Sequence, residues 1–302
     1  MLAVALTVCA ALAAGVGAER RFGARAERGV ARVLDAMLWV AIPFATFPLV
    51  ARLEITGGLR AGLGLAVLEL LVVAALAWVA GARVLRLPGP ATGALICATA
   101  LANTGYLGLP ATIALLGPGQ LGAAVAWDSL VSGPMGLVVG AAVGAALGTA
   151  AGDRTRDRIV AFVTRNPPLW ATVLGLAAPD ALAPDPLVEA ARVVVIALLP
   201  VGFFVVGVNL AAEGGVRFPP PLTRPVAAAV GLRLLVAPGL FAALAAPVAG
   251  IPGAFYLLSA MPSAISALVI AHAYGLDVRL TASAIAWTTS LVILAGLVSL
   301  LA

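Results

Sequence analysis

Residues 101–110 read LANTGYLGLP and residues 258–266 read LSAMPSAIS, and each of these segments interrupts a long apolar stretch. Glycine and proline both weaken a helix, proline by removing a backbone N–H and clashing with the preceding turn. In hydrocarbon the freed backbone groups need partners, so such breaks persist where unwound backbone lines a polar cavity. Each segment therefore predicts a half-helix whose N-terminus offers N–H groups and a positive dipole end to an anion.

The composition places both segments in a membrane. The chain has 302 residues, of which 63% are hydrophobic and 10% are charged, whereas a soluble domain carries roughly 25% charged residues. A membrane-spanning helix uses roughly 20 residues, so about ten spans fill the chain and leave short loops. We expect an all-α, multi-pass integral membrane protein with the lipid bilayer as its solvent.

The apolar runs predict ten spans. An apolar run opens the chain, and we expect it to be a retained first helix, because no positive residue precedes it and several arginines follow it. The predicted spans lie at 2–18, 36–52, 59–81, 91–116, 121–149, 167–179, 186–211, 224–247, 251–275 and 280–301.

The arginines set the orientation of these spans. All 18 basic residues are Arg, and basic residues concentrate in cytoplasmic loops. With the N-terminus outside, the outside loops carry Arg52, Arg60 and Arg192. The inside loops carry Arg20, Arg21, Arg25, Arg28, Arg32, Arg83, Arg86, Arg154, Arg156, Arg158, Arg165, Arg217, Arg224 and Arg279. This asymmetry predicts that both termini lie outside the cell (inner or plasma) membrane.

A weak internal repeat relates the two halves of the chain. A shift of 157 residues lays Pro43 on Pro200, Phe47 on Phe204 and Gly105 on Pro262. An odd number of spans per repeat inserts the two halves in opposite directions, and inverted repeats of this kind form binding sites at their interface. We expect a first five-helix repeat at 1–149, a cytoplasmic linker at 150–166 and an inverted second repeat at 167–302.

The segment NTGYLGLP at 103–110 resembles the fourth-helix signature of the auxin efflux carrier family. Residues 261–265 and 274–277 are similar to its ninth-helix segment, and residues 42–47 and 206–210 are weaker echoes. The resemblance implies two inverted five-helix repeats in which broken helices four and nine cross and frame the substrate site. It also implies a homodimer that transports small organic anions, such as auxin, malonate or malate.

One departure from this family leaves the substrate and the coupling ion open. Many members carry an acidic or amide group after the ninth-helix break, whereas this chain has Ser263, Ser266 and then His272. The wider superfamily includes sodium–bile acid symporters, so a sodium-coupled, bile-acid-like symporter is an alternative. His272 either titrates near neutral pH or caps a helix end.

Residues beside the two breaks are the predicted substrate-binding residues. An alternative is that glycine and proline are simply common in membrane helices and that the polar groups hold helices together. Two breaks at matched positions of a repeat favour the functional interpretation. The predicted residues are Asn103, Thr104, Gly105, Tyr106, Pro110, Pro262, Ser263 and Ser266.

Three ionisable residues lie inside predicted spans, where a charge costs several kcal/mol. Arg233 is predicted to bind a substrate carboxylate through its guanidinium fork, or alternatively to pair with Glu69 so that each offsets the burial of the other. Glu69 and Asp128 are candidates for carrying a coupling proton, because burial disfavours the charged form of a carboxyl group. The alternative for Asp128 is a passive, hydrogen-bonded residue near the outer interface.

The sequence thus predicts a secondary carrier of small organic anions that works by alternating access. A passive membrane subunit of a larger transport complex is an alternative, and it has no use for paired breaks. We expect no enzyme activity, because the chain has one His and no Gly-x-Ser-x-Gly motif, and no P-loop, because it has no Lys. We also expect no metal site, no cofactor beyond a coupling H⁺ or Na⁺, and no nucleic-acid partner.

Overall fold

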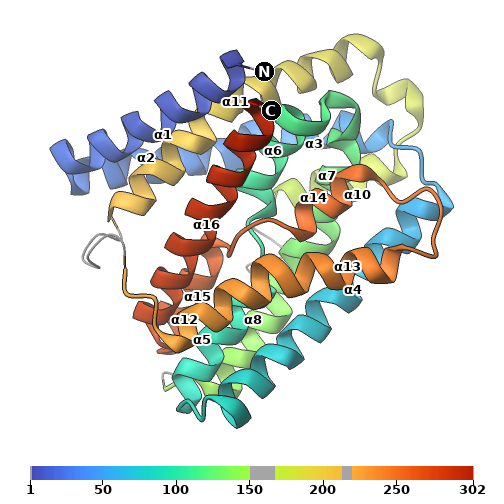
Figure 1. The fold of residues 1–302 in the computed structure, drawn as a ribbon. Helices are drawn as coiled ribbons and strands as arrows, with labels where there is room; N and C mark the ends of the chain where they lie inside the picture. Colours follow the sequence, from blue (N-terminus) through green and yellow to red (C-terminus); the bar gives the residue numbers. More distant parts are fainter. Residues whose placement is uncertain (1, 150–166, 213–219, 302) are drawn as a thin grey trace.

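The protein is an all-helical bundle. The computed structural model describes residues 2–149, 167–212 and 220–301, and within these ranges the ordered elements are helices joined by short connections. The predicted linker at 150–166 lies outside the described residues. Figure 1 shows long helices stacked side by side, with several of them interrupted along their length. The prediction of an all-α protein is confirmed.

Short π-helical turns, labelled η, join many of the helices into longer rods. In the first half of the chain the elements are α1 (Leu2–Phe22), α2 (Ala24–Ala36), η1 (Met37–Ala41), α3 (Ile42–Ala51), α4 (Gly57–Trp78), η2 (Val79–Val84), α5 (Gly89–Ala100), η3 (Thr104–Gly108), α6 (Leu109–Leu116), the 3₁₀ turn η4 (Pro118–Gln120), α7 (Leu121–Trp127), η5 (Asp128–Ser132) and α8 (Gly133–Leu147).

The second half is built in the same way. Its elements are α10 (Pro167–Ala177), the 3₁₀ turn η6 (Asp180–Leu182), α11 (Asp185–Ala212), α12 (Arg224–Gly231), η8 (Leu232–Val236), α13 (Ala237–Ala245), α14 (Gly253–Ser259), α15 (Ile265–Tyr274) and α16 (Val278–Leu301).

Within the described residues, four continuous helices are long and apolar enough to cross a membrane. They run over Gly57–Val84, Pro118–Leu147, Arg224–Ala245 and Val278–Gly296. Shorter apolar helices cover Trp39–Ala51, Thr104–Leu116 and Ile265–Tyr274. The lengths and composition are those of an integral membrane protein, and the count of ten spans stays a prediction.

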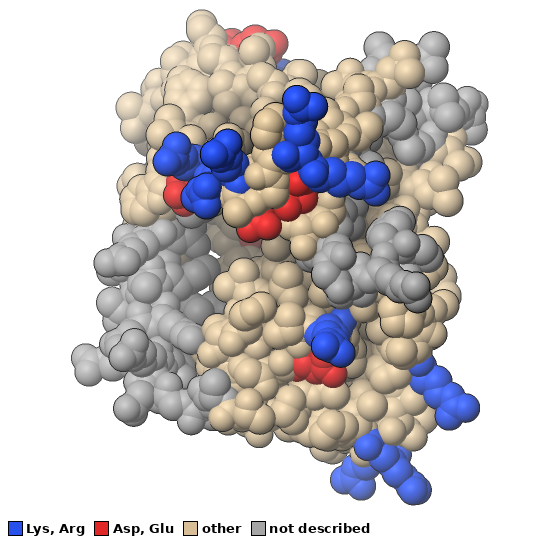
Figure 2. Space-filling view, turned by 90° about the vertical axis from the view of Figure 1, so that its left-hand side faces the viewer, with Lys and Arg blue, Asp and Glu red and all other residues tan. Residues whose placement is uncertain are grey.

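The second span differs from its prediction. Residues 19–35 were expected in a loop before a span at 36–52, but residues 24–36 form α2 and continue through η1 into α3. Alanine, arginine and glutamate favour the helix, and no proline interrupts the segment. Its basic side chains Arg25, Arg28 and Arg32 are exposed, and Figure 2 shows basic side chains gathered with acidic ones across the upper part of this face.

Helices from the two halves of the chain pack against one another. The helix α1 runs along α11, α10 along α3, α13 along α4 and α16 along α5; the pairing of α1 with α11 and of α4 with α13 is visible in Figure 1. Each pair joins an element from the first half to one from the second half. The interior of the bundle therefore forms between the halves, where the two interrupted apolar stretches meet.

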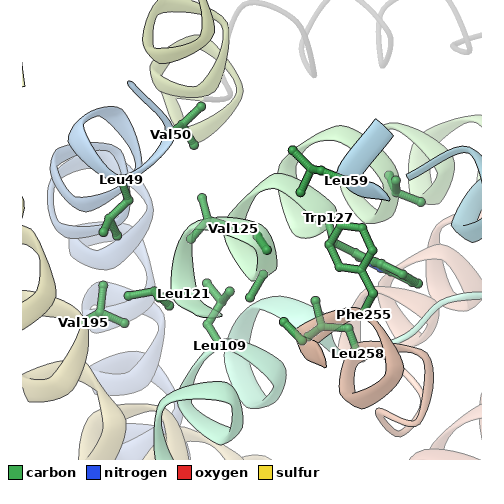
Figure 3. Close-up of a cluster of buried hydrophobic side chains, with 14 of the residues drawn as sticks. Leu49, Val50, Leu59, Leu109, Leu121, Val125, Trp127, Val195, Phe255 and Leu258 are labelled. Atoms are coloured by element: carbon green, nitrogen blue, oxygen red, sulfur yellow. The ribbon is translucent and has the colours of Figure 1, made fainter. Parts of the chain in front are cut away.

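An aromatic cluster holds α7 against the second half. The Trp127 ring contacts Phe241 of α13 and Phe255 of α14 edge to face, with ring centroids 5.2 and 5.0 Å apart. Figure 3 shows Trp127 beside Phe255, with Leu121 further along the same helix. Edge-to-face pairs add about 0.5–1.5 kcal/mol beyond the area that they bury, so this cluster fixes α7 next to the broken helix that contains α14.

Close packing of α1 on α11 depends on Gly15. A Cβ atom at this position would lie 2.9 Å from the Val208 nitrogen and 3.0 Å from the Gly207 Cα, and closer still to the Phe204 carbonyl oxygen. Because these are backbone atoms of α11, they cannot move aside as a side chain can. Small residues allow such close approach of helices in membranes.

We predict that Gly15→Ala lowers the thermal stability of the purified protein, whereas Gly17→Ala does not. A Cβ at Gly17 meets nothing within 4 Å, and alanine favours the helix by about 1 kcal/mol over glycine. The melting temperature of each variant is measured in detergent by heating samples and quantifying the remaining folded protein by size-exclusion chromatography. Equal melting temperatures for the two variants would contradict the close approach of α1 and α11.

Candidate functional site at the crossing of two broken helices

The two broken helices meet at their breaks. The helix α5 ends at Ala100 and α14 ends at Ser259, and the chain beyond them forms an antiparallel bridge between Ala102 and Ser263. The Asn103 N–H donates to the Pro262 carbonyl at 2.8 Å, and the Ala264 N–H donates to the Leu101 carbonyl at 2.8 Å. Backbone groups that the breaks release therefore satisfy one another, as burial in a membrane requires.

Both breaks lie close to their predicted positions; the second is centred on Pro262, whereas the first falls before Gly105. Helical structure resumes at Thr104, so Gly105 lies inside η3. Leu101 is extended, with φ −92° and ψ 110°, and Ala264 is extended with ψ 145°. Pro262 has no N–H to donate, but the bridge needs only its carbonyl, which accepts from the Asn103 N–H. A proline is therefore compatible with this position of the bridge.

Ser263 bonds the second break to α5 and to α16. Its hydroxyl donates to the Ala98 carbonyl of α5 at 2.6 Å, and its N–H donates to the Thr288 hydroxyl of α16 at 3.1 Å. The residue is fully buried. In this conformation Ser263 therefore stabilises the crossing itself, and it is absent from the lining of the polar cavity described next.

A polar cavity of about 230 Å³ lies beside the crossing. Both resumed half-helices begin at its wall: η3 and α6 on one side, and α15 on the other. The first N–H groups of a helix have no partner within it and carry a partial positive charge, so the wall favours a negative ligand. The lining residues are Ile42, Ala102, Asn103, Thr104, Gly105, Tyr106, Asp128, Ser129, Ser132, Gly133, Leu169, Ala264, Ile265 and Ser266.

Asp128 brings a carboxylate into this cavity. The residue begins η5, and the Thr104 hydroxyl donates to its Oδ1 at 2.5 Å. A Cβ at Gly105 would lie 3.3 Å from both carboxylate oxygens, so glycine leaves the space that Asp128 occupies. The sequence placed these residues in different spans, and the structure brings them into contact.

Asn103 lines the same cavity with its side chain. Its backbone N–H and carbonyl are bonded to Pro262 and Gly108, and only 4% of the residue is exposed. Within the described part of the chain, no hydrogen bond is made by its side-chain amide. Because Asn103 lines the cavity, its amide is available to a ligand bound there.

Arg233 and Glu69 lie outside the lining of this cavity. The Arg233 guanidinium donates to the Thr99 carbonyl at 3.0 Å and to the Ser259 carbonyl, and it lies 3.8 Å from the Glu69 Oε1. Both side chains are buried. The sequence left two roles open for Arg233, binding a substrate carboxylate or pairing with Glu69. In this conformation Arg233 is paired with Glu69.

The remaining predicted residues fall at the edges of the site. Tyr106 also lines a second cavity of about 30 Å³, which Pro110 shares, between the crossing and α11. His272 is exposed in the last turn of α15. The sequence analysis missed Ser129 and Ser132, which also line the polar cavity. Ser132 lies four residues after Asp128 and therefore on the same helix face, and this spacing could have identified it.

The lining of the cavity is rich in hydrogen-bonding groups. Among the residues that the structure describes, no group of three His, Cys, Asp or Glu side chains could hold a metal ion. The cavity instead offers N–H groups, hydroxyl groups and one amide, with a single carboxylate.

Residues 160–300 match the model of a family described as membrane transport protein. This part of the chain is similar to that family. The match confirms the resemblance to the auxin efflux carriers, and it includes the second break, whereas the segment at 103–110 lies outside it. A search of the curated proteins finds no match.

We predict that Thr104 and Asp128 are energetically coupled. Thr104→Val and Asp128→Asn should each change stability, and the double variant should differ from their sum by about 1.5–3 kcal/mol, the contribution of a hydrogen bond to a charged group. The free energy of unfolding of each protein in this double-mutant cycle is measured in detergent. The control is Thr112→Val, a buried threonine that bonds to the Gly108 carbonyl, which should be additive with Asp128→Asn.

Proposed function

We propose that this protein is a secondary carrier of small organic anions that works by alternating access. The supporting observation is the polar cavity at the crossing, where two half-helix N-termini and the Asn103 amide converge. Helix N-termini bind carboxylates through their free N–H groups and dipoles. A passive membrane subunit, the alternative, has no need of a buried anion-binding cavity.

The size of the cavity favours small substrates. Its volume of about 230 Å³ is below the roughly 300–1,000 Å³ of cavities that hold drug-sized ligands. A short dicarboxylate such as malonate or malate suits this volume, an auxin-like acid would fill it, and a bile acid exceeds it. We therefore favour short carboxylates over a bile-acid-like substrate.

Asp128 supports coupling to protons. An anionic substrate and an ionised Asp128 would repel each other inside one buried cavity, and a proton on Asp128 removes that repulsion. Binding of the proton and of the anion then favour each other reciprocally. Sodium is the alternative coupling ion, since the Asp128 carboxylate and the Thr104 hydroxyl oxygens are hard ligands.

The proposed architecture is the inverted repeat. Two five-helix repeats, at 1–149 and 167–302, are joined by a linker at 150–166, with both termini outside the cell membrane and the carrier acting as a homodimer. The antiparallel meeting of two broken helices, one from each half, supports this arrangement. The distribution of arginines supports the orientation.

We predict saturable uptake of one short carboxylate by the purified protein in liposomes, lost in Asn103→Ala. Labelled malonate, malate, indole acetate and a bile acid are each offered with a proton gradient, a sodium gradient or neither. The control is Ser299→Ala, whose hydroxyl bonds to its own helix away from the polar cavity. Uptake that Asn103→Ala leaves intact would remove this cavity as the site.

We predict that Asp128→Asn transports the same anion without dependence on a proton gradient. The amide keeps the size of the side chain but binds no proton, so its neutral form mimics the protonated carrier. Uptake is measured at a fixed substrate gradient with and without an imposed pH difference. An Asp128→Asn carrier that still responds fully to the pH difference would exclude this residue as the coupling site.

A further inference from the structure

Arg233 lies where two half-helices end. Its guanidinium bonds to the carbonyl of Thr99 in the last turn of α5 and to the carbonyl of Ser259 at the end of α14. These carbonyls come from opposite halves of the chain, and each belongs to a helix that stops at the crossing. One fully buried cation therefore caps both helices at once.

The charges at this cap balance without Glu69. A helix C-terminus carries roughly half a negative charge, so two such ends together offset about one positive charge, that of Arg233. An ionised Glu69 would then be an excess negative charge in the interior. Its Oε1 is buried with no hydrogen-bond partner in the described residues, and at 3.8 Å from Arg233 the contact is too long for a hydrogen bond.

We propose that Glu69 is a second proton-binding site, which holds its proton while Arg233 caps α5 and α14 and releases it when the cap opens. The proposal rests on the proposed carrier function, because transport is what moves the crossing. When the half-helix ends leave Arg233, the guanidinium loses their negative charge and an ionised Glu69 replaces it. Release of the proton and opening of the crossing therefore favour each other.

A small cavity gives the proton a way out. Glu69 and Arg233 line a space of about 30 Å³, larger than the roughly 10–15 Å³ that one water molecule needs. Three residues of its wall, Ala102, Ser132 and Ser266, also line the substrate cavity. The O–H bond of Glu69 breaks, water in this space accepts the proton, and the electron pair stays on the carboxylate beside Arg233.

Few other titratable groups surround Glu69. Arg233 faces it from η8, and Asp128 lies one helical turn before Ser132 but lines the substrate cavity instead. The neighbouring half-helices contribute Cys97 on α5 and Tyr256 on α14, and α13 contains no titratable side chain. A protonation change inside the bundle can therefore be assigned to Glu69 or to Asp128 by substitution.

Infrared difference spectroscopy of the full-length protein in lipid nanodiscs tests this directly. At neutral pH the wild-type protein should show the carbonyl band of a protonated carboxylic acid, and Glu69→Gln should lose it. The control variant Asp128→Asn should keep it. A spectrum of Glu69→Gln that retains the full wild-type band, or a wild-type protein without the band, would overturn the proposal.

A second measurement does not depend on the folding of Glu69→Gln. In the Asp128→Asn protein, the band should weaken as the pH is raised, and hydrogen exchange should become faster at the ends of α5 and α14. A band that does not change with pH would contradict a titrating Glu69. Because neither readout uses transport, failure of the uptake assay with a persistent band would reject the proposed function alone.

Discussion

The antiparallel pairing of Leu101–Asn103 with Pro262–Ala264 is the interaction on which the rest of the site depends. Two interrupted helices in hydrocarbon would leave backbone groups without partners, at a cost of several kcal/mol each. The two bonds across the bridge remove part of that cost at the point where the helices stop. They also fix the positions of four helix ends, and every group of the candidate site is placed relative to those ends.

The crossing separates two kinds of helix end. The C-termini of α5 and α14 lie on one side, where Arg233 neutralises them. The N-termini that follow lie at the polar cavity, where N–H groups attract negative charge. This arrangement explains why the buried cation is not in the cavity: the helix dipoles already provide the positive potential there, and the guanidinium is needed at the opposite ends.

Polarity, more than volume, distinguishes the candidate site. A larger cavity of about 390 Å³ lies between α6, α14 and α16, yet among its lining residues the polar side chain is Ser299. Such a surface has nothing with which to orient a carboxylate. The smaller cavity combines Asn103, Thr104 and Asp128 with two helix N-termini, and a small organic anion can be both bound and oriented by these groups.

The sequence by itself determined the all-α membrane class and the approximate positions of both breaks, because hydropathy and the effects of glycine and proline act locally along the chain. It also placed Asn103 and Thr104 beside a break. Only the tertiary structure decided that Ala102 pairs with Ser263, that Thr104 bonds to Asp128 and that Arg233 caps two helices. These contacts join residues 24 to more than 130 positions apart, and their geometry follows from how whole helices pack.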